Sequence, residues 1–207
     1  MALGIAAIFY LLGSIPIAWI MAKLVRRDDI RNLGSGNVGV MNVALSVARW
    51  AGILVFLSEA AKGALAVILA RKMGLNDGYV AMAVVMALVG TSWSIWIGGA
   101  GGRGNTLGMT AILVLAWPVV LISLALWVVV RLVTRRSFIA TRVWIFTLPA
   151  ILGLVTRSWI YALMGVAMSL IYLSAHKVTT DDHTIIKETW PNLWAFLTSP
   201  PRDRHSS

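Results

Sequence analysis

The segment RNLGSGNVGVMN, from Arg31 to Asn42, places glycines and small polar residues between two apolar stretches. Glycine tolerates positive φ and lets the backbone approach a ligand closely, so successive N–H groups can converge on an anion. Neutral donors and one arginine accompany the glycines; the set comprises Arg31, Gly34, Ser35, Gly36, Asn37, Gly39 and Asn42. This pattern favours a phosphate-binding loop, although a simple turn between helices requires the same glycines.

A second glycine-rich segment, GGAGGRGN, covers residues 98–105 and precedes an apolar run. A glycine turn that opens a helix near Asn105 would direct backbone donors and the positive end of the helix dipole toward one point. The forked guanidinium of Arg103 suits bidentate contact with phosphate, whereas retention on the cytoplasmic side also explains a single arginine. The predicted binding residues of this loop are Gly101, Gly102, Arg103, Gly104 and Asn105. Two such loops on one membrane face favour phosphate binding.

Glu59 and Lys62 form a charged pair inside an apolar run, three residues apart and therefore on one helix face. Charges inside a membrane span are costly and usually face the interior of the helix bundle. The pair either fixes helix packing or holds Lys62 near an anionic ligand. His176 ends the last apolar run, where a histidine is a favourable partner of the helix dipole or a functional group.

The composition indicates an integral membrane protein. The 207 residues are 59% hydrophobic and 13% charged, with a mean hydropathy of +0.83. The formal net charge is +10, but the basic residues lie at the ends of apolar runs, a pattern typical of membrane topology rather than of nucleic-acid binding. Cysteine is absent and the three histidines are scattered, so we expect no metal and no cofactor.

These features require an all-α bundle of membrane-spanning helices to position the loops. The apolar runs are Ala2–Ala22, Ala51–Ala70, Tyr79–Ile97, Thr106–Val130, Phe138–Val155 and Trp159–Ala175, and about 20 helical residues cross a bilayer core of about 30 Å. The fourth run contains Trp117–Pro118 at its middle, so it is either one kinked helix or two short ones.

The basic residues distinguish the two possibilities, because lysine and arginine are retained on the cytoplasmic side. With seven crossings and the N-terminus outside, only Arg71, Lys72 and Arg157 lie outside, whereas six crossings would also expose residues 131–142 and the tail. We therefore predict about seven transmembrane helices, a cytoplasmic C-terminus and both glycine loops on the cytoplasmic side. Residues 1–176 form the predicted transmembrane domain. Residues 177–207 form a cytoplasmic tail with an interfacial segment and a disordered end.

The combination of YLLGSIP, GSGNVGVMN, EAAKGA, GGRG and a histidine after the last span resembles the bacterial acyl-phosphate glycerol-3-phosphate acyltransferases, from about Tyr10 to His176. The resemblance implies a seven-helix protein of the bacterial inner (plasma) membrane with its active site facing the cytoplasm. It also implies transfer of a fatty acyl group from acyl-phosphate to the 1-hydroxyl of glycerol 3-phosphate, which gives lysophosphatidic acid and inorganic phosphate. Acyl-phosphate is an activated mixed anhydride, so positioning and charge stabilisation suffice and the donor's phosphate is available to take the hydroxyl proton.

We expect catalytic roles for Ser35, Asn37, Lys62, Arg103 and His176. We expect substrate or phosphate binding by Gly34, Gly36, Gly39, Asn42, Arg49, Glu59, Gly101, Gly102, Gly104 and Asn105. Glu59 replaces the aspartate of the family pattern, and Arg49 is one turn beyond Leu45, which replaces an arginine. Further replacements remove a histidine at Thr91, a lysine at Ala100 and an asparagine at Thr179.

The replaced residues leave other functions open. Each lost charge-assisted hydrogen bond removes about 1.5–3 kcal/mol, so several together are capable of abolishing the ordinary activity. One alternative is another polyol-phosphate acceptor, with the segment SWSIW, residues 92–96, reshaping the pocket. Another is a non-enzymatic anion-binding membrane protein or a transporter.

Overall fold

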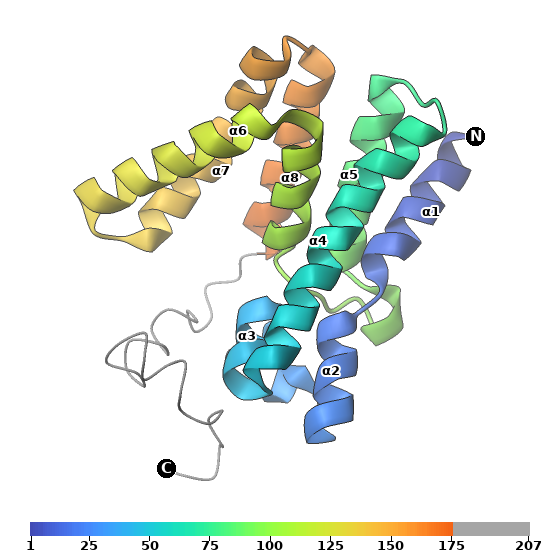
Figure 1. Ribbon diagram of the computed structural model, residues 1–207, viewed down its shortest axis with the longest axis vertical. Coiled ribbons are helices and arrows are strands. Elements are labelled where there is room, and N and C mark those ends of the chain that lie inside the picture. Colours follow the sequence, from blue (N-terminus) through green and yellow to red (C-terminus); the bar gives the residue numbers. More distant parts are fainter. Residues whose placement is uncertain (176–207) are drawn as a thin grey trace.

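The computed structural model describes residues 1–175, and its regular elements are helices (Figure 1). The α-helices are α1 (Ala2–Ser14), α2 (Ile17–Arg26), α3 (Val40–Ser46), α4 (Arg49–Lys72), α5 (Asp77–Ser92), α6 (Asn105–Thr134), α7 (Ser137–Thr156) and α8 (Trp159–Ala175). Two short 3₁₀ helices, η1 (Ile30–Asn32) and η2 (Ile95–Ile97), lie in the glycine-rich connections. His176, Thr179 and the predicted tail lie outside the described residues.

The helices pass alternately up and down through the bundle, in the order α1, α4, α5, the two arms of α6, α7 and α8 (Figure 1). The short helices α2 and α3 lie at the end of the molecule where α8 finishes, and the N-terminus lies at the opposite end. By length and composition, four segments are able to cross a membrane: Ala2–Arg26, Arg49–Lys72, Asn105–Thr134 and Ser137–Thr156. The prediction of an all-helical membrane bundle is therefore confirmed.

The first apolar run is broken, contrary to the prediction of one continuous helix over Ala2–Ala22. Helix α1 ends at Ser14 and α2 begins at Ile17, because Pro16 has no N–H to continue the helical hydrogen bonds. The Nζ atom of Lys62 donates hydrogen bonds to the carbonyl oxygens of Gly13 (3.2 Å) and Ile15 (2.6 Å). The buried ammonium group of Lys62 thus provides hydrogen bonds to two carbonyl oxygens near the break in the helix.

Helix α6 is also interrupted, at the place that its proline predicts. Ala116 has a non-helical backbone conformation, with φ −156° and ψ 79°, two residues before Pro118. The arm before the kink runs beside α4 and α8, whereas the arm after it leans away from the bundle together with α7 (Figure 1). The run thus forms two arms joined at a kink, and as a whole it is one of the segments long and apolar enough to cross a membrane.

Small residues allow the helices that support the loops to pack closely, as is common in membrane proteins. A side chain at Gly13 would collide with the backbone of Ala87, and one at Gly90 would collide with the backbone of Tyr10, so α1 and α5 lie in direct contact. A side chain at Gly63 would collide with the backbone of Leu107, which fixes α4 against the first arm of α6.

The helices differ in length, and this difference creates a recess. Helix α1 has 13 residues and α5 has 16, which corresponds to lengths of about 20 and 24 Å against a hydrocarbon core of about 30 Å. Helix α4 has 24 residues, and Lys62 near its middle contacts the end of α1. The ends of α1 and α5 therefore lie at the depth of the middle of α4. The second glycine loop, which follows α5, lies in the resulting recess, whereas the first follows α2 and η1.

Candidate active site

The first glycine loop is shaped by the buried side chain of Asn42. Its Nδ2 atom donates hydrogen bonds to the carbonyl oxygens of Leu33 and Asn37, both at 2.9 Å. Its Oδ1 atom accepts hydrogen bonds from the backbone N–H of Ser35 and from Oγ of Ser46, both at 3.1 Å. Asn42 thus holds the loop closed, and its amide protons face backbone carbonyls rather than a ligand.

Two of the three predicted glycines of this loop have the left-handed conformation. The φ angles of Gly34 and Gly36 are +52° and +72°, whereas Gly39 is extended, with φ −144°, where it precedes α3. The expectation of positive φ is therefore wrong for Gly39. A side chain at Gly34 would also collide with the Oδ1 atom of Asn42.

The second loop lies against the first. A Cβ atom at Gly102 would come within 2.5 Å of the carbonyl oxygen of Val38, so the two backbones meet at this point. The N–H of Gly102 donates a hydrogen bond of 2.9 Å to the carbonyl oxygen of Thr91, at the end of α5. Helix α6 begins at Asn105, as predicted, and no side chain among residues 1–175 caps its N-terminus. Its first N–H groups therefore remain available to an anion.

Arg31 connects the two loops through a second contact. Its Nη1 atom donates a hydrogen bond to the carbonyl oxygen of Ile97 (3.3 Å), and its Nε and Nη2 atoms donate to the carboxylate of Asp29 (2.9 and 2.7 Å). The Nε1 atom of Trp19 donates to the same carboxylate at 3.0 Å. The hydrogen bonds from Arg31 hold the pKa of Asp29 well below its usual range. From the sequence, Arg31 was predicted only to supply positive charge near the loop, and its partner Asp29, two residues earlier, was not predicted.

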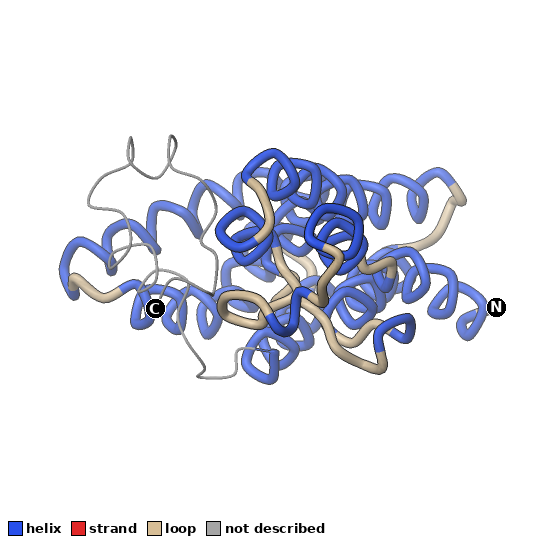
Figure 2. The backbone as a smooth tube through the Cα atoms, turned by 90° about the horizontal axis from the view of Figure 1, so that it is seen from below, coloured by secondary structure: helices blue, strands red, loops and turns tan. Residues whose placement is uncertain are grey.

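Two cavities meet where the loops touch, and Figure 2 shows the connecting segments from this end of the molecule. The first cavity, of about 320 Å³, is lined by residues 37–41, Phe56, Glu59, Thr91 and residues 102–106. The second, of about 310 Å³, is lined by Arg31, residues 35–38, Ser92, Trp93, residues 99–103, Ser174 and Ala175. Both cavities are lined by Asn37, Val38, Gly102 and Arg103.

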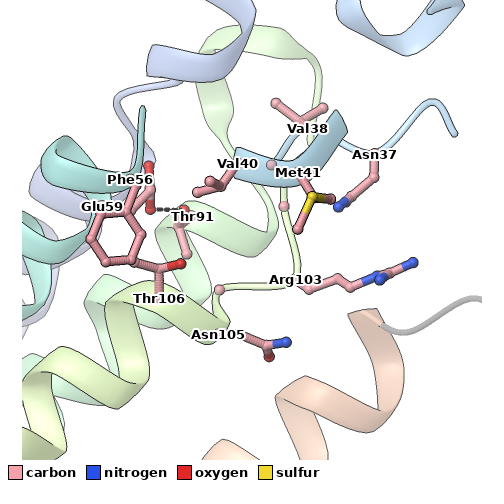
Figure 3. Close-up of a pocket in the computed structure, with 13 residues that line it drawn as sticks. Asn37, Val38, Val40, Met41, Phe56, Glu59, Thr91, Arg103, Asn105 and Thr106 are labelled. Carbon is pink, nitrogen blue, oxygen red and sulfur yellow. Dashed lines mark hydrogen bonds between the residues drawn. The ribbon is translucent and has the colours of Figure 1, made fainter. Parts of the chain in front are cut away.

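Apolar and polar side chains both line the first cavity; in Figure 3 Phe56 lies near Glu59, and Met41 lies near Asn37. Met41 and Phe56 are 38% and 48% exposed. The side chain of Arg103 points away from Glu59, toward the side where α8 ends. Asn105 also lines this cavity, and its Oδ1 atom is buried without a hydrogen-bond partner among residues 1–175.

The intramembrane ion pair lies at the inner end of this cavity. Oε1 of Glu59 accepts a hydrogen bond of 2.6 Å from Nζ of Lys62, and Oε2 accepts one of 2.8 Å from Oγ1 of Thr91 (Figure 3). Lys62 is 5% exposed, donates to three acceptors, and is not one of the described residues that line either cavity. Of the two interpretations of this pair, the geometry favours the one in which Lys62 fixes helix packing.

Some of the remaining residues singled out from the sequence line a cavity, and others do not. Ser35 and Ala100 line the second cavity, whereas Arg49 begins α4 and is not one of the described residues that line either cavity. Leu45 is buried in α3. His176 directly follows Ala175, which lines the second cavity, but His176 itself lies outside the described residues.

The segment SWSIW, predicted only to reshape the pocket, begins at Ser92, the last residue of α5, and its individual cavity residues were not predicted. Ser92 lines the second cavity, and its buried Oγ atom has no hydrogen-bond partner within residues 1–175. Trp93 lines the same cavity, whereas Trp96 is 62% exposed and donates a hydrogen bond from Nε1 to Oγ of Ser14 (3.0 Å). The tryptophan-rich segment thus contributes only in part to the cavity wall.

The arrangement is suited to holding two anionic groups side by side. Arg103 contributes positive charge to both cavities, and the uncapped N-terminus of α6 lies at the first. The carboxylate of Glu59 already accepts a hydrogen bond at each oxygen, so it is poorly placed to take a proton from a ligand. Positioning and charge stabilisation are therefore the chemistry that the site offers.

Comparison with known proteins gives a consistent result. A family model described as glycerol-3-phosphate acyltransferase matches residues 3–182. A glycerol-3-phosphate acyltransferase of Synechococcus sp. (strain CC9902) is 36% identical over 176 residues, which cover 85% of this chain and 88% of that protein. One of Neisseria gonorrhoeae (strain NCCP11945) is 35% identical over 177 residues, which cover 83% of this chain and 88% of the relative.

Two solved structures share the fold. One is the glycerol 3-phosphate form of PlsY, an integral membrane glycerol 3-phosphate acyltransferase; its TM-score is 0.73 at 26% identity, with 84% of this chain and 88% of that chain covered. The other is the lysophosphatidic acid form of PlsY, with a TM-score of 0.72 at 22% identity and with 96% and 99% covered.

Proposed function

The chain belongs to the glycerol-3-phosphate acyltransferase family, and from this premise we propose how its two cavities divide the substrates of the reaction. The protein is a membrane enzyme that acylates glycerol 3-phosphate and produces lysophosphatidic acid. Its substrates are acyl-phosphate and glycerol 3-phosphate, and both carry a phosphate group. One observation carries the proposal: Arg103 and Asn37 line both cavities, so one guanidinium is adjacent to both sites.

The first cavity receives the acyl donor. Its apolar lining residues Met41 and Phe56 are exposed at the surface of the bundle, where a fatty chain enters from the lipid. The phosphate of the donor lies toward Arg103 and the first N–H groups of α6, which stabilise negative charge. The backbone of the glycine loop at Gly102 and Gly104 provides further close contacts.

The second cavity receives glycerol 3-phosphate. Its lining contains Arg31, Ser35, Ser92 and Arg103, together with glycines of the second loop. A small, charged and water-soluble substrate suits these polar groups. Ala175, at the end of α8, also lines this cavity.

The reaction then needs no protein nucleophile. The 1-hydroxyl oxygen of glycerol 3-phosphate forms a bond to the acyl carbon, and the bond from that carbon to the phosphate oxygen breaks. The hydroxyl proton passes to the departing phosphate, which leaves as inorganic phosphate. Support comes from Glu59, since both of its oxygens already accept hydrogen bonds, from Lys62 and Thr91. Arg103 and the N-terminus of α6 stabilise the charge that develops on the leaving group.

We also propose an orientation in the bacterial plasma membrane, with the N-terminus outside and the loops facing the cytoplasm. The loop end of the bundle carries Arg26, Arg27, Arg31, Arg49 and Arg103, and the α6–α7 connection carries further arginines. The opposite end carries Arg71, Lys72 and Arg157, of which Arg71 pairs with Asp77 at 2.9 Å. This asymmetry follows the retention of basic residues on the cytoplasmic side.

The decisive experiment supplies the purified protein with acyl-phosphate and glycerol 3-phosphate and measures lysophosphatidic acid and inorganic phosphate in equal amounts. A panel of other polyol phosphates, run in parallel, tests the acceptor. Product from another acceptor alone would contradict the assignment of glycerol 3-phosphate to the second cavity. Absence of any acyl product, beside an active relative, would contradict the proposed donor and mechanism.

A further inference from the structure

A continuous chain of hydrogen bonds runs from the broken end of α1 to the second glycine loop. It begins at the carbonyl oxygens of Gly13 and Ile15, which accept from Lys62, and continues through the contact of Lys62 with Glu59. Oε2 of Glu59 accepts from Oγ1 of Thr91 at 2.8 Å. The chain therefore reaches the last turn of α5, immediately before the glycine-rich segment.

Thr91 carries the connection onward through its backbone. Its carbonyl oxygen accepts a hydrogen bond of 2.9 Å from the N–H of Gly102, and Gly102 lies against Val38 of the first loop and precedes Arg103. Thr91 is 9% exposed, so neither of its contacts is readily replaced by solvent. One residue thus contacts the ion pair through its side chain and the glycine loop through its main chain.

The side chain of Thr91 is oriented differently from other threonines in the membrane helices. Threonine in a helix commonly donates a hydrogen bond to the carbonyl oxygen four residues earlier, as Thr110 and Thr147 do here. Thr91 instead donates across to α4. This hydrogen bond fixes the end of α5 to Glu59 in α4.

The resemblance to the acyltransferases implies an aspartate and a histidine at the positions that Glu59 and Thr91 occupy in this chain. Here the hydroxyl of Thr91 donates to Oε2 of Glu59, and both oxygens of the carboxylate accept a hydrogen bond. The replacement at position 91 therefore does not leave Glu59 with a free oxygen, and it puts a non-titrating group at the inner end of the first cavity.

We infer that Thr91 is a positioning residue. Its side chain is held by the Glu59–Lys62 pair, and its carbonyl oxygen holds Gly102. Thr91 therefore fixes the position of the neighbouring Arg103 between the two cavities. The inference rests on the proposed role of Arg103 in binding both phosphates. Loss of the hydroxyl frees Oε2 of Glu59 and loosens the end of α5. The second loop then samples positions in which Arg103 no longer faces both substrates.

The test compares Thr91→Val, which has the shape of threonine without its hydroxyl, with Thr91→Ser, which keeps the hydroxyl. Thr147→Val is the matched control, because Thr147 bonds only within α7. We expect Thr91→Val to raise the KM for glycerol 3-phosphate about tenfold or more, with a smaller change in kcat, since a hydrogen bond to a charged group is lost. Thr91→Ser and Thr147→Val should stay within about twofold of the wild type.

Hydrogen exchange of the peptide that contains residues 98–104 gives a second, independent measurement. Thr91→Val should increase exchange in this peptide relative to the wild type and to Thr147→Val at equal temperature, whereas Thr91→Ser should not. This measurement needs no turnover, so it tests the coupling even if the acceptor or donor of the proposed reaction is wrong.

Three results would overturn the inference. The first is unchanged exchange in residues 98–104 of Thr91→Val. The second is a KM in Thr91→Ser as high as in Thr91→Val. The third is a loss of activity in Thr91→Val that disappears when the rate is expressed per folded molecule, because a purely structural role would lower the folded fraction and leave KM unchanged. If Thr91→Val does not fold, Glu59→Asp, which withdraws the acceptor from Thr91, takes its place with the same expected results.

Discussion

Individual side chains in this protein divide into those that face the cavities and those that hold the loops. Arg103, Asn37 and Ser35 line cavities, whereas Asn42 and Lys62 form hydrogen bonds within the protein. All five are polar residues in or near glycine-rich or charged motifs, so residue type alone does not separate the two groups. The separation follows from burial, because a buried polar group needs partners within the protein.

Arg103 provides the direct test of the shared site. Arg103→Ala should raise the KM for a phosphate-bearing substrate about tenfold or more, because a charge-assisted contact is removed. Ser35→Ala should lower turnover with a smaller effect. Lys72→Ala, at the opposite end of the bundle, is the control for loss of one positive charge. Wild-type kinetics in both site variants would show that the two-loop site is misassigned.

Asn42 should matter for stability more than for chemistry. Asn42→Ala removes several hydrogen bonds and leaves buried backbone groups without partners, so the free energy of unfolding should fall by at least about 2 kcal/mol. Asn76→Ala is the comparison, since Asn76 only caps α5 and such a cap contributes about 1 kcal/mol. Thermal unfolding of the two variants in the same detergent gives the difference. Equal losses would mean that Asn42 has no special role in holding the loop.

At the level of the elements, broken and shortened helices make the site. Proline ends α1, Ala116 interrupts α6, and α1 and α5 stop where α4 still continues. The second glycine loop follows α5 in the resulting recess and meets the first loop at Gly102 and Val38. Irregular backbone is tolerated at membrane depth only where protein or a polar cavity surrounds it, and here both conditions hold.

The contact between the loops predicts a strong effect of a single methyl group. Gly102→Ala places a Cβ atom against the carbonyl oxygen of Val38 and must push the loops apart, so kcat/KM should fall by about tenfold or more. Gly4→Ala is the control, because nothing lies within 4 Å of a Cβ atom there. A kinetic assay at saturating acyl-phosphate detects the difference. Full activity in Gly102→Ala would contradict the close approach of the loops.

The link between Arg31 and Asp29 predicts a dependence on pH. The folded-state pKa of Asp29 is lowered by hydrogen bonds from Arg31, so its contribution to stability is present above the unfolded pKa of about 3.9. The contribution is lost as the pH falls from there through the folded-state pKa. The difference in Tm between the wild type and Asp29→Asn should therefore be constant from neutral pH to about pH 5 and shrink below about pH 4. A difference that grows on acidification would contradict the pairing.

At the level of the whole molecule, the alternating passes bring both glycine loops and the end of α8 to one end of the bundle, away from the N-terminus (Figure 1). This arrangement follows from the kink in α6: a straight α6 would place α7 and α8 in the opposite direction and carry the end of α8 away from the loops. The apolar surfaces of α4, α6 and α7 face outward, as a surrounding lipid requires.

The orientation can be tested with introduced cysteines, because the natural chain has none. Met73→Cys, beside the connection between α4 and α5, should react with a membrane-impermeant maleimide in intact cells. Leu132→Cys, near the α6–α7 connection, should react only after the membrane is opened. Both side chains are exposed, at 54% and 72%. Labelling of Leu132→Cys in intact cells would contradict the seven-crossing topology.

The sequence by itself determined the class of the protein, the approximate positions of its helices and the presence of two glycine loops. Hydrophobic runs and the distribution of charge follow from the bilayer, which acts on every residue of a span and needs no knowledge of partners. The kink near Pro118 was also predictable, because proline disrupts a helix locally. The break at Pro16 and the early end of α5 were not predicted, because both lie within runs of apolar residues.

Only the tertiary structure decided which polar residues face a cavity. Lys62 lies in a motif that suggested ligand binding, yet its three donors are directed to Gly13, Ile15 and Glu59. The sequence suggested that Thr91 only removes a histidine, whereas in the structure Thr91 joins α4 to the second loop. The Glu59–Lys62 pair follows from local spacing. The contacts of Lys62 with Gly13 and Ile15, and of Thr91 with Glu59, join residues 49, 47 and 32 positions apart, and no local pattern of residue types encodes them. Long-range packing selects the partner of each buried polar group, and the site is the set of groups left facing the cavities.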